Sequence, residues 1–364
     1  MTPVEHHVDA AVSHYFVYVP SRNAMRMFLY PTRIGLYRYL KGYWLNRGSF
    51  DSFILMAIYN GTFVFTVNGR RSVARTGDLV LLDCHAPNVY QAKAETDCTL
   101  LWMHFDGRLA RDYFEAIHSD LGDVITLRRA TYAISRLRMV YDTFAEERKV
   151  DEARMSLTIT EVLTECLTDA VGVRQAERRK ASIRGATERD AAHGAEIADA
   201  DGYDGGDGGA STSTSTSTST SEGIARKGSE TLYNQHAIEE TLSYIATHLS
   251  EPLPVARLAA MALMSEYYYI RVFRKVTGYT PHTYIINARM HAAKYMLLTG
   301  DATLKEICAA CGFSSTSAFC AAFRKRFGVT PLTFRASAKT SAMPESDESR
   351  AHPARNRAPH HRPR

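Results

Sequence analysis

The chain has 364 residues, of which 45% are hydrophobic, and this length suggests two or three domains with sizeable cores. No apolar run approaches the roughly 18 residues of a membrane-spanning helix, and the first ten residues lack the basic and apolar regions of a signal peptide. The formal net charge is only +5, and the six cysteines do not have the spacing of a disulfide framework. We therefore expect a cytoplasmic protein without a membrane span and without disulfides.

Residues 1–107 are predicted to form a β domain. Between residues 15 and 105, short apolar or alternating runs are separated by glycine-containing turns, as in a sandwich or a small barrel. The pair Asn68-Gly69 lies between two such runs and predicts a two-residue hairpin.

Residues 108–173 are predicted to form helices, because apolar residues recur there at helical spacing. One apolar face contains Ile134, Leu137, Val140, Tyr141 and Phe144, and a second contains Leu157, Val162, Leu163 and Leu167. Such helices either cover the β domain only or also form a dimer interface, and the sequence leaves both readings open.

Residues 174–230 are rich in charged and small residues and include five Ser-Thr repeats. This composition cannot bury enough apolar surface to fold, so it predicts a disordered tether that couples its neighbours only loosely. The tail, residues 338–364, is predicted to be disordered too, with an Arg- and His-rich end that could add nonspecific phosphate contacts.

A pattern that occurs twice marks residues 231–337 as a further domain. At about 254–276 and again at about 303–327, a short helix with one apolar face is followed by a break, a serine that can cap a helix, and a longer amphipathic helix. Each copy closes with Phe-Arg-Lys and then Gly-X-Thr-Pro, which ends a helix. This order of elements is that of a helix-turn-helix unit, whose second helix enters the major groove of DNA.

Between the two copies, residues 281–299 carry apolar positions at helical spacing and predict a helix of about eighteen residues, about 27 Å long. This length is close to one turn of DNA, so one protomer could place two helices in successive major grooves. From residue 251 to residue 335 there are eleven Lys or Arg against four Asp or Glu, which gives the segment the positive charge that phosphates require.

The segment from Tyr244 to Arg335 resembles the DNA-binding domain of the AraC/XylS family of bacterial transcription regulators. The resemblance rests on "EPLPVARLA", "FRKVTGYTPHTYI", "CGF" and "AFCAAFRKRFGVTP", and on Arg289, Ala293 and Leu297 in the connecting helix. The order of Gly61, Gly77, His85, Pro87 and "WMHFDG" likewise resembles the cupin-like effector domain of many members. The expected fold is α+β multidomain: a cupin-like β-barrel with following helices, a disordered linker, and an all-α domain with two helix-turn-helix motifs.

A cupin can also be a metal enzyme, so its histidines need consideration. His85 and His104 are far apart in sequence, and catalytic cupins supply several histidines and a carboxylate to one metal. Cys308 and Cys311 fall on an apolar helical face without a second pair, which favours core packing over a metal or redox site. We therefore expect no metal, no other cofactor and no enzymatic activity.

The barrel interior is the expected place for a small-molecule effector. Aromatic residues that could line such a pocket are Phe53, Tyr59, Phe65, Tyr90 and Trp102. The alternative is that these side chains only fill the core.

The predicted recognition helices, 265–276 and 315–327, supply the candidate DNA contacts. For base reading, the family resemblance implies Tyr267, Ile270 and Arg271 in the first helix and Thr316 and Ser317 in the second. Arg271 is the strongest candidate, because its planar guanidinium can donate two hydrogen bonds to a guanine. Phosphate contacts are expected from Ser265, Arg274, Lys275, Ser315, Arg324 and Lys325.

The second motif departs from the family, because Ala321 stands where many members carry arginine and Ala318 replaces an aromatic. Small side chains discriminate bases weakly, so the first motif is expected to carry most of the sequence reading.

The favoured function is therefore a regulator that binds double-stranded promoter DNA. The resemblance implies a small-molecule effector, contact with RNA polymerase, activation rather than repression, and a homodimer. Two alternatives stay open: a DNA-binding scaffold whose barrel binds no ligand, and a metal-dependent cupin enzyme.

Overall fold

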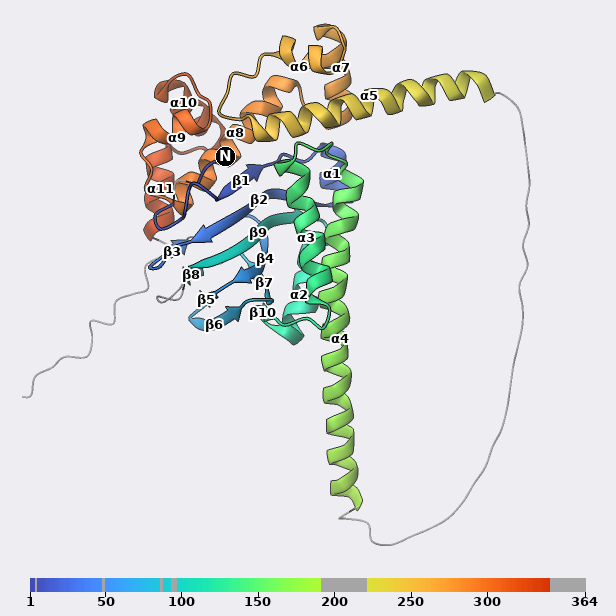
Figure 1. Ribbon diagram of the computed structural model, residues 1–364, viewed down its shortest axis with the longest axis vertical. Coiled ribbons are helices and arrows are strands. Elements are labelled where there is room, and N and C mark those ends of the chain that lie inside the picture. Colours follow the sequence, from blue (N-terminus) through green and yellow to red (C-terminus); the bar gives the residue numbers. More distant parts are fainter. Residues whose placement is uncertain (4, 48–49, 86–87, 93–96, 191–220, 341–364) are drawn as a thin grey trace, which may run out of the picture.

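The computed structural model describes residues 1–3, 5–47, 50–85, 88–92, 97–190 and 221–340. The N-terminal part contains antiparallel strands in two sheets, with orders β1-β2-β9-β4-β7-β10 and β3-β8-β5-β6 (Figure 1). Their bounds are β1 His14–Val17, β2 Leu29–Tyr39, β3 Trp44–Arg47, β4 Phe53–Asn60, β5 Thr62–Val67, β6 Arg70–Arg75, β7 Leu79–Asp83, β8 Asn88–Ala92, β9 Cys98–Gly107 and β10 Val124–Ile125. The predicted strand-rich N-terminal domain is confirmed.

The hairpin at Asn68-Gly69 is also confirmed. Asn68 and Gly69 both have positive φ, 50° and 76°, as a type I′ turn requires, and β5 and β6 pair directly on either side of them. The sequence predicted this turn because few other dipeptides adopt that conformation at low cost.

Strand alternation decides which side chains face the interior between the two sheets. In β4, Ile54 and Met56 face the interior and pair with His104 and Trp102 of β9, which face the same way. The intervening residues of both strands, such as Leu55 of β4, point to the opposite face of the six-stranded sheet.

Helices cover that opposite face (Figure 1). They are α2 (Ala110–Leu121), α3 (Ala130–Ala145) and α4 (Glu152–Asp190), and the short α1 (Arg22–Met27) lies beside β2. In α3, Leu137, Val140, Tyr141 and Phe144 are buried as expected.

Leu157 was wrongly assigned to the buried face of α4, since 59% of its side chain is exposed. The buried face is formed by Ile159, Val162, Leu163 and Cys166, which occupy positions i, i+3, i+4 and i+7 of one helical face. Leu157 precedes Ile159 by two positions, which is about 200° around the helix, and so it points away from the sheet.

The predicted linker is shorter than expected at both ends. Helix α4 continues to Asp190, and α5 (Ser221–Thr247) begins before residue 230. Residues 174–190 are mostly Ala, Arg, Glu and Lys, which propagate a helix that a buried segment has already nucleated, so the prediction of disorder there was wrong. The Ser-Thr repeats, within residues 191–220, lie outside the described residues, as do residues 341–364 of the tail.

The C-terminal domain has the two predicted helix-turn-helix units. They are α6 (Val255–Met261) with α7 (Glu266–Thr277), and α9 (Leu304–Ala310) with α10 (Thr316–Phe327); α8 (Pro281–Thr299) connects them and α11 (Pro331–Thr340) follows. Each turn contains a positive φ, at Leu263 (54°) and at Gly312 (70°). Ser265 and Ser315 cap α7 and α10, and Gly278 and Gly328 end them in left-handed conformations.

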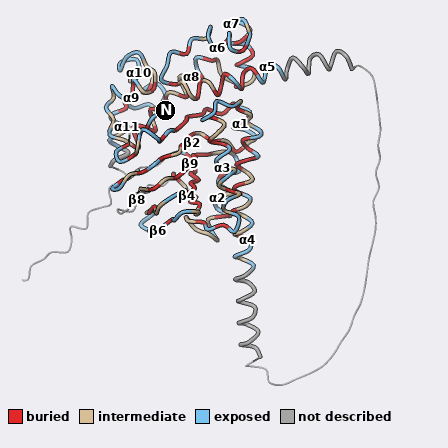
Figure 2. Tube along the Cα trace, in the orientation of Figure 1, coloured by how far each residue is buried: buried red, intermediate tan, exposed pale blue. Residues whose placement is uncertain are grey.

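Helix α8 is buried along most of its length, as Figure 2 shows, because it has neighbours on two sides. It packs against α7, α9, α10 and α11 within its own domain, and against β1 and β3 of the β domain. Helix α5 also contacts β1 and α3. The expectation of loosely coupled domains was therefore wrong. The length of a tether limits only how far apart two domains can move, whereas the apolar surfaces of the domains decide whether they pack together.

None of the helices in the described ranges has the length and apolar character that crossing a membrane requires.

Candidate DNA-binding surface and effector cavity

Helix α7 is amphipathic, and its outer face presents the predicted base-reading residues. Tyr269, Val272 and Phe273 anchor its inner face in the core. On the outer face, Tyr267 is 81% exposed, Ile270 is 37% exposed, and Arg271 is exposed with its guanidinium carbon 5.0 Å from the centroid of the Tyr268 ring.

The predicted phosphate contacts lie at the two ends of this helix. Arg274 and Lys275 are exposed in its last turn. The Ser265 hydroxyl accepts a hydrogen bond from the Tyr268 backbone N–H at its first turn, so this serine stabilises the helix N-terminus, where backbone donors also favour phosphate.

Helix α10 repeats this arrangement with smaller side chains. Thr316 and Ser317 are exposed at its start, and the Ser315 hydroxyl accepts from the backbone N–H of Ala318. Arg324 and Lys325 are exposed in its last turn.

Arg326 is exposed in the same turn and was not predicted as a contact; the run Arg-Lys-Arg was the signal that could have included it. Within the parts of the chain that the structure describes, no carboxylate lies within 4 Å of the side-chain nitrogens of Arg271, Arg274, Lys275, Arg324, Lys325 or Arg326. These cations are therefore available to phosphates and bases.

The second candidate site is a cavity between the two sheets of the β domain. Its lining is largely aromatic and comes from both sheets and from α8: Tyr39, Tyr43, Ile54, Met56, Phe63, Leu100, Trp102, His104 and Tyr295. Its cavity volume is about 10 Å³, which is roughly the room of one water molecule.

Two comparisons with known families agree with this division of the chain. A family model described as "AraC-like ligand binding domain" matches residues 33–163, and one described as "Helix-turn-helix domain" matches residues 258–337. Together the two matches cover more than half of the chain. The chain belongs to the AraC family of regulators.

Known proteins resemble about a quarter of this AraC-type chain. It is 32% identical over 93 residues to the probable transcriptional regulator LumQ of Photobacterium leiognathi, covering 26% of this chain and 38% of that protein. It is 36% identical over 95 residues to the uncharacterized HTH-type transcriptional regulator YobQ of Bacillus subtilis, covering 26% and 39%. The chain therefore spans less than two fifths of the length of these relatives.

Among solved structures, the DNA-binding domain of AdpA, a global transcriptional factor in complex with a target DNA, is similar at 35% identity. The similarity covers 28% of this chain and 91% of that chain, with a TM-score of 0.27.

Of the aromatic residues predicted to line an effector pocket whose side chains the structure describes, only Trp102 lines the cavity of this AraC-type domain. Phe53 lies against Phe114 of α2, with ring centroids 5.2 Å apart, and Tyr59 lies against Arg138 of α3. Both are odd-numbered residues of β4, and alternation turns them toward the helices, so these two assignments were wrong. Phe65 is buried beside Phe63 without lining the cavity, and the side chain of Tyr90 lies outside the described residues.

The two histidines considered as metal ligands have different surroundings. His104 is buried at the cavity, with its Nδ1 2.9 Å from the Ser52 hydroxyl. His85 is exposed and interacts with Asp83. Over the described ranges, no three His, Cys, Asp or Glu side chains are grouped so that they could hold a metal ion. Cys308 and Cys311 are buried, as expected for core residues.

The residues that join the two domains were not predicted from the sequence. Tyr295 of α8 donates a hydrogen bond from its hydroxyl to Glu5 Oε1 at 2.9 Å, and Tyr43 donates to Glu5 Oε2 at 2.7 Å. Arg33 donates from Nη2 to the backbone carbonyl of His291, also on α8, at 2.9 Å. The sequence carried no signal for these pairs, because Glu5 and Tyr295 are 290 residues apart.

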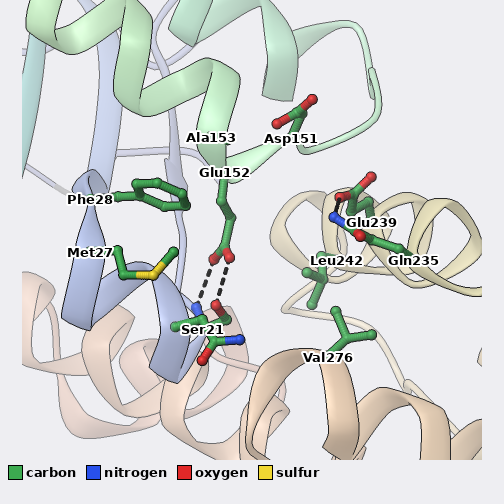
Figure 3. Close-up of a pocket in the computed structure, with 11 residues that line it drawn as sticks. Ser21, Met27, Phe28, Asp151, Glu152, Ala153, Gln235, Glu239, Leu242 and Val276 are labelled. Atoms are coloured by element: carbon green, nitrogen blue, oxygen red, sulfur yellow. Dashed lines mark hydrogen bonds between the residues drawn. The ribbon is translucent and has the colours of Figure 1, made fainter. Parts of the chain in front are cut away.

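A second interdomain cleft lies where α1, the start of α4, α5 and α7 meet (Figure 3). Its volume is about 280 Å³, and Glu152 lies at its wall. The Glu152 carboxylate accepts hydrogen bonds from the Ser21 backbone N–H at 2.7 Å, the Ser21 hydroxyl at 2.6 Å and the Tyr18 hydroxyl at 2.7 Å. Glu239, on the α5 side, pairs with Lys149 at 2.7 Å. The acidic side chains Glu152 and Glu239 of this cleft thus already have partners within the protein.

Proposed function

We propose that the protein is a sequence-specific regulator of transcription in the cytoplasm, which binds double-stranded promoter DNA and responds to a small-molecule effector in its β domain. One observation carries the DNA-binding part of this proposal: two capped, amphipathic helices, α7 and α10, present exposed cations with no carboxylate partner among the described residues. Neutralising phosphates is the main source of affinity for DNA, and free Arg and Lys side chains supply it.

The geometry further supports simultaneous contact of both helices with one duplex. Helix α8 has 19 residues and is therefore about 28 Å long. One turn of DNA is about 34 Å, so helices held apart by α8 suit successive major grooves on one face.

The experiment is selection of bound sequences from a random duplex pool by the full-length protein, with and without an extract of cell metabolites. We expect an enriched site with two blocks about one helical turn apart, and a changed enrichment with extract. A variant with Arg271, Arg274 and Lys275 all replaced by alanine is the matched control, because these side chains are exposed and their loss leaves the fold intact. Failure of the wild-type protein to enrich any sequence under either condition would reject the proposal.

A homodimer, contact with RNA polymerase and activation of transcription are further parts of the proposal. Exposed apolar side chains on α3 and α4 support a dimer interface there: Met139 is 44% exposed, Leu157 59% and Val171 39%. Sedimentation of the wild-type protein and of Leu157→Glu would test it, since a charge at the centre of an interface should give monomers.

A further inference from the structure

Tyr295 brings a phenol ring from the DNA-binding domain into the β domain. It is 3% exposed, and its ring stacks on Trp102 with centroids 5.5 Å apart and an interplanar angle of 22°. On another side its ring centroid lies 5.2 Å from that of Tyr15. The hydroxyl donates to the buried carboxylate of Glu5. Tyr295 thus has the contacts that a bound aromatic ligand would make.

With Tyr295 in place, the cavity is full. The remaining space of about 10 Å³ holds roughly one water molecule, so no aromatic ligand fits beside the ring. Any ligand of this cavity must therefore replace Tyr295.

The surroundings of the ring define the chemistry of such a ligand. Trp102 and Tyr15 provide aromatic surfaces, and Glu5 Oε1 provides an acceptor for a ligand hydroxyl in the place of the Tyr295 hydroxyl. A buried carboxylate disfavours an anionic group in the same position and accepts a phenol strongly.

Further buried donors surround this position. Within the described residues, the hydroxyls of Tyr15 and Tyr37 and the indole N–H of Trp102 have no hydrogen-bond partner. Such groups are rare in folded proteins and favour a ligand that brings an acceptor.

We propose that the effector is a phenolic aromatic compound that takes the place of the Tyr295 ring, and that Tyr295 holds the DNA-binding domain against the β domain until that compound binds. This inference rests on the proposed function for its regulatory part.

The contacts next to Tyr295 explain how displacement of its ring would change the DNA-binding surface. The carbonyl of His291 accepts from Arg33, and Lys294 pairs with Asp51 at 2.8 Å. His291, Lys294 and Tyr295 occupy one face of α8 at spacings of three and four, and all hold the same helix to the β domain. Because α8 also spaces the two helix-turn-helix units, loosening this face changes how both units meet DNA. Effector and DNA affinities are then coupled in both directions.

The test is calorimetric titration of the full-length protein with p-cresol, the tyrosine side chain as a free molecule. Tyr295→Ala should bind p-cresol at least tenfold more tightly than the wild type, because no internal ring competes. The vacated cavity, on the order of 100 Å³, is comparable with engineered cavities that bind benzene. Tyr295→Phe keeps the ring and loses the Glu5 hydrogen bond, so its affinity should lie between the two.

Three controls separate this mechanism from general loosening. Tyr279→Ala removes a different interdomain contact, with Arg22 at 5.2 Å, and should leave p-cresol affinity at the wild-type value. Toluene, which lacks the hydroxyl, and cyclohexanol, which lacks the aromatic ring, should both bind Tyr295→Ala more weakly than p-cresol. Equal p-cresol affinity of the wild type and Tyr295→Phe, together with no gain in Tyr295→Ala, would overturn the inference even if Tyr295→Ala folded poorly.

A DNA-binding measurement distinguishes this inference from the proposed function. If selected DNA is bound and saturating p-cresol shifts wild-type affinity toward that of Tyr295→Ala, both stand. If DNA is bound but neither p-cresol nor Tyr295→Ala changes the affinity, the coupling through Tyr295 is wrong and the function stands. If no variant binds DNA while p-cresol binding follows the expected order, the function is wrong and the phenol site stands.

Discussion

The surroundings of Arg271 favour the prediction that it reads a base rather than only attracting phosphate. Its guanidinium lies over the Tyr268 ring at 5.0 Å, and Asn234 Nδ2 donates to the Tyr268 hydroxyl at 2.9 Å. A stacked guanidinium loses less freedom when it forms two hydrogen bonds with a guanine than a freely moving one does. Arg324, in the last turn of α10, is better placed for the phosphate backbone.

Replacing Arg271 by alanine should therefore lower the ratio of specific to nonspecific affinity, by about 1 to 3 kcal/mol. Arg324→Ala should instead weaken binding to all sequences alike and reduce the slope of log affinity against log salt by about one. Binding titrations on the selected site and on a scrambled duplex at several salt concentrations measure both. An unchanged ratio in Arg271→Ala would refute the assignment.

Gly35 allows Trp102 to take its position in the cavity. A Cβ at Gly35 would lie 2.5 Å from Cζ2 of Trp102 and 2.9 Å from Cβ of Tyr15. Gly35→Ala should lower the free energy of unfolding by about 1 to 3 kcal/mol and shift the fluorescence of Trp102. Gly172→Ala in α4, where the nearest atom would be 3.8 Å away, is the control and should be neutral or stabilising. Chemical denaturation checks both, and equal stability of the two variants would contradict the packing argument.

Among the elements, α8 has two roles that compete for its surface. One side supports the two helix-turn-helix units, and the other is pinned to the β domain by Arg33 and Glu5. A helix that only spaced two DNA-binding units could be polar on its outer side. Burial on both sides explains why so many apolar residues occur in its second half.

The pH dependence of stability should report on this helix. Burial lowers the pKa of His291 to about 3, and Arg33, Arg326 and Lys294 act in the same direction while Asp51 opposes them. In the unfolded chain the pKa of His291 is about 6.5. Below that pH the His291 side chain therefore binds a proton in the unfolded state but stays neutral in the folded state. The contribution of His291 to stability is therefore complete above pH 6.5 and decreases as the pH falls.

Between pH 6.5 and pH 5 this loss should amount to about 2 kcal/mol. Thermal melts at both pH values measure it, with His291→Gln as the control that should lose less stability over the same interval. An identical loss in both proteins would mean that other groups cause the pH dependence.

At the scale of the whole molecule, the two domains pack directly against each other, although a linking segment separates them in sequence. Strand β3 contacts α11, the helix that follows the second helix-turn-helix unit, and Arg22 of α1 lies against Tyr279, just after the first unit. The segments next to both units thus contact the domain that contains the candidate effector cavity. Such an arrangement lets one ligand affect both units together.

Simultaneous binding of both units predicts a dependence on the spacing within the operator. Inserting five base pairs between the two selected blocks rotates them by about half a turn, and inserting ten moves them about 34 Å further apart, beyond the reach set by α8, so both insertions should lower affinity to that of one block. Footprinting and binding titrations on these duplexes are the measurement. Equal affinity for all three spacings would mean that only one unit reads the DNA.

The sequence by itself determined the features that depend on short-range chemistry. The hairpin at Asn68, the turn at Gly312 and the caps at Ser265 and Ser315 were predicted, because each requires particular residues at neighbouring positions. The helices of the C-terminal domain and the exposed residues of α7 followed from helical periodicity, which the same local geometry enforces.

Only the tertiary structure decided which aromatic residues face the cavity. Phe53 and Tyr59 differ from Ile54 and Met56 only by strand alternation, and composition does not say which face of a sheet the helices will cover. Likewise, no local pattern could pair Glu5 with Tyr295 or show that the DNA-binding domain contributes a wall of the cavity between the sheets. Such contacts arise when apolar surfaces distant in sequence are buried together, and the free energy of that burial depends on shape rather than on sequence order.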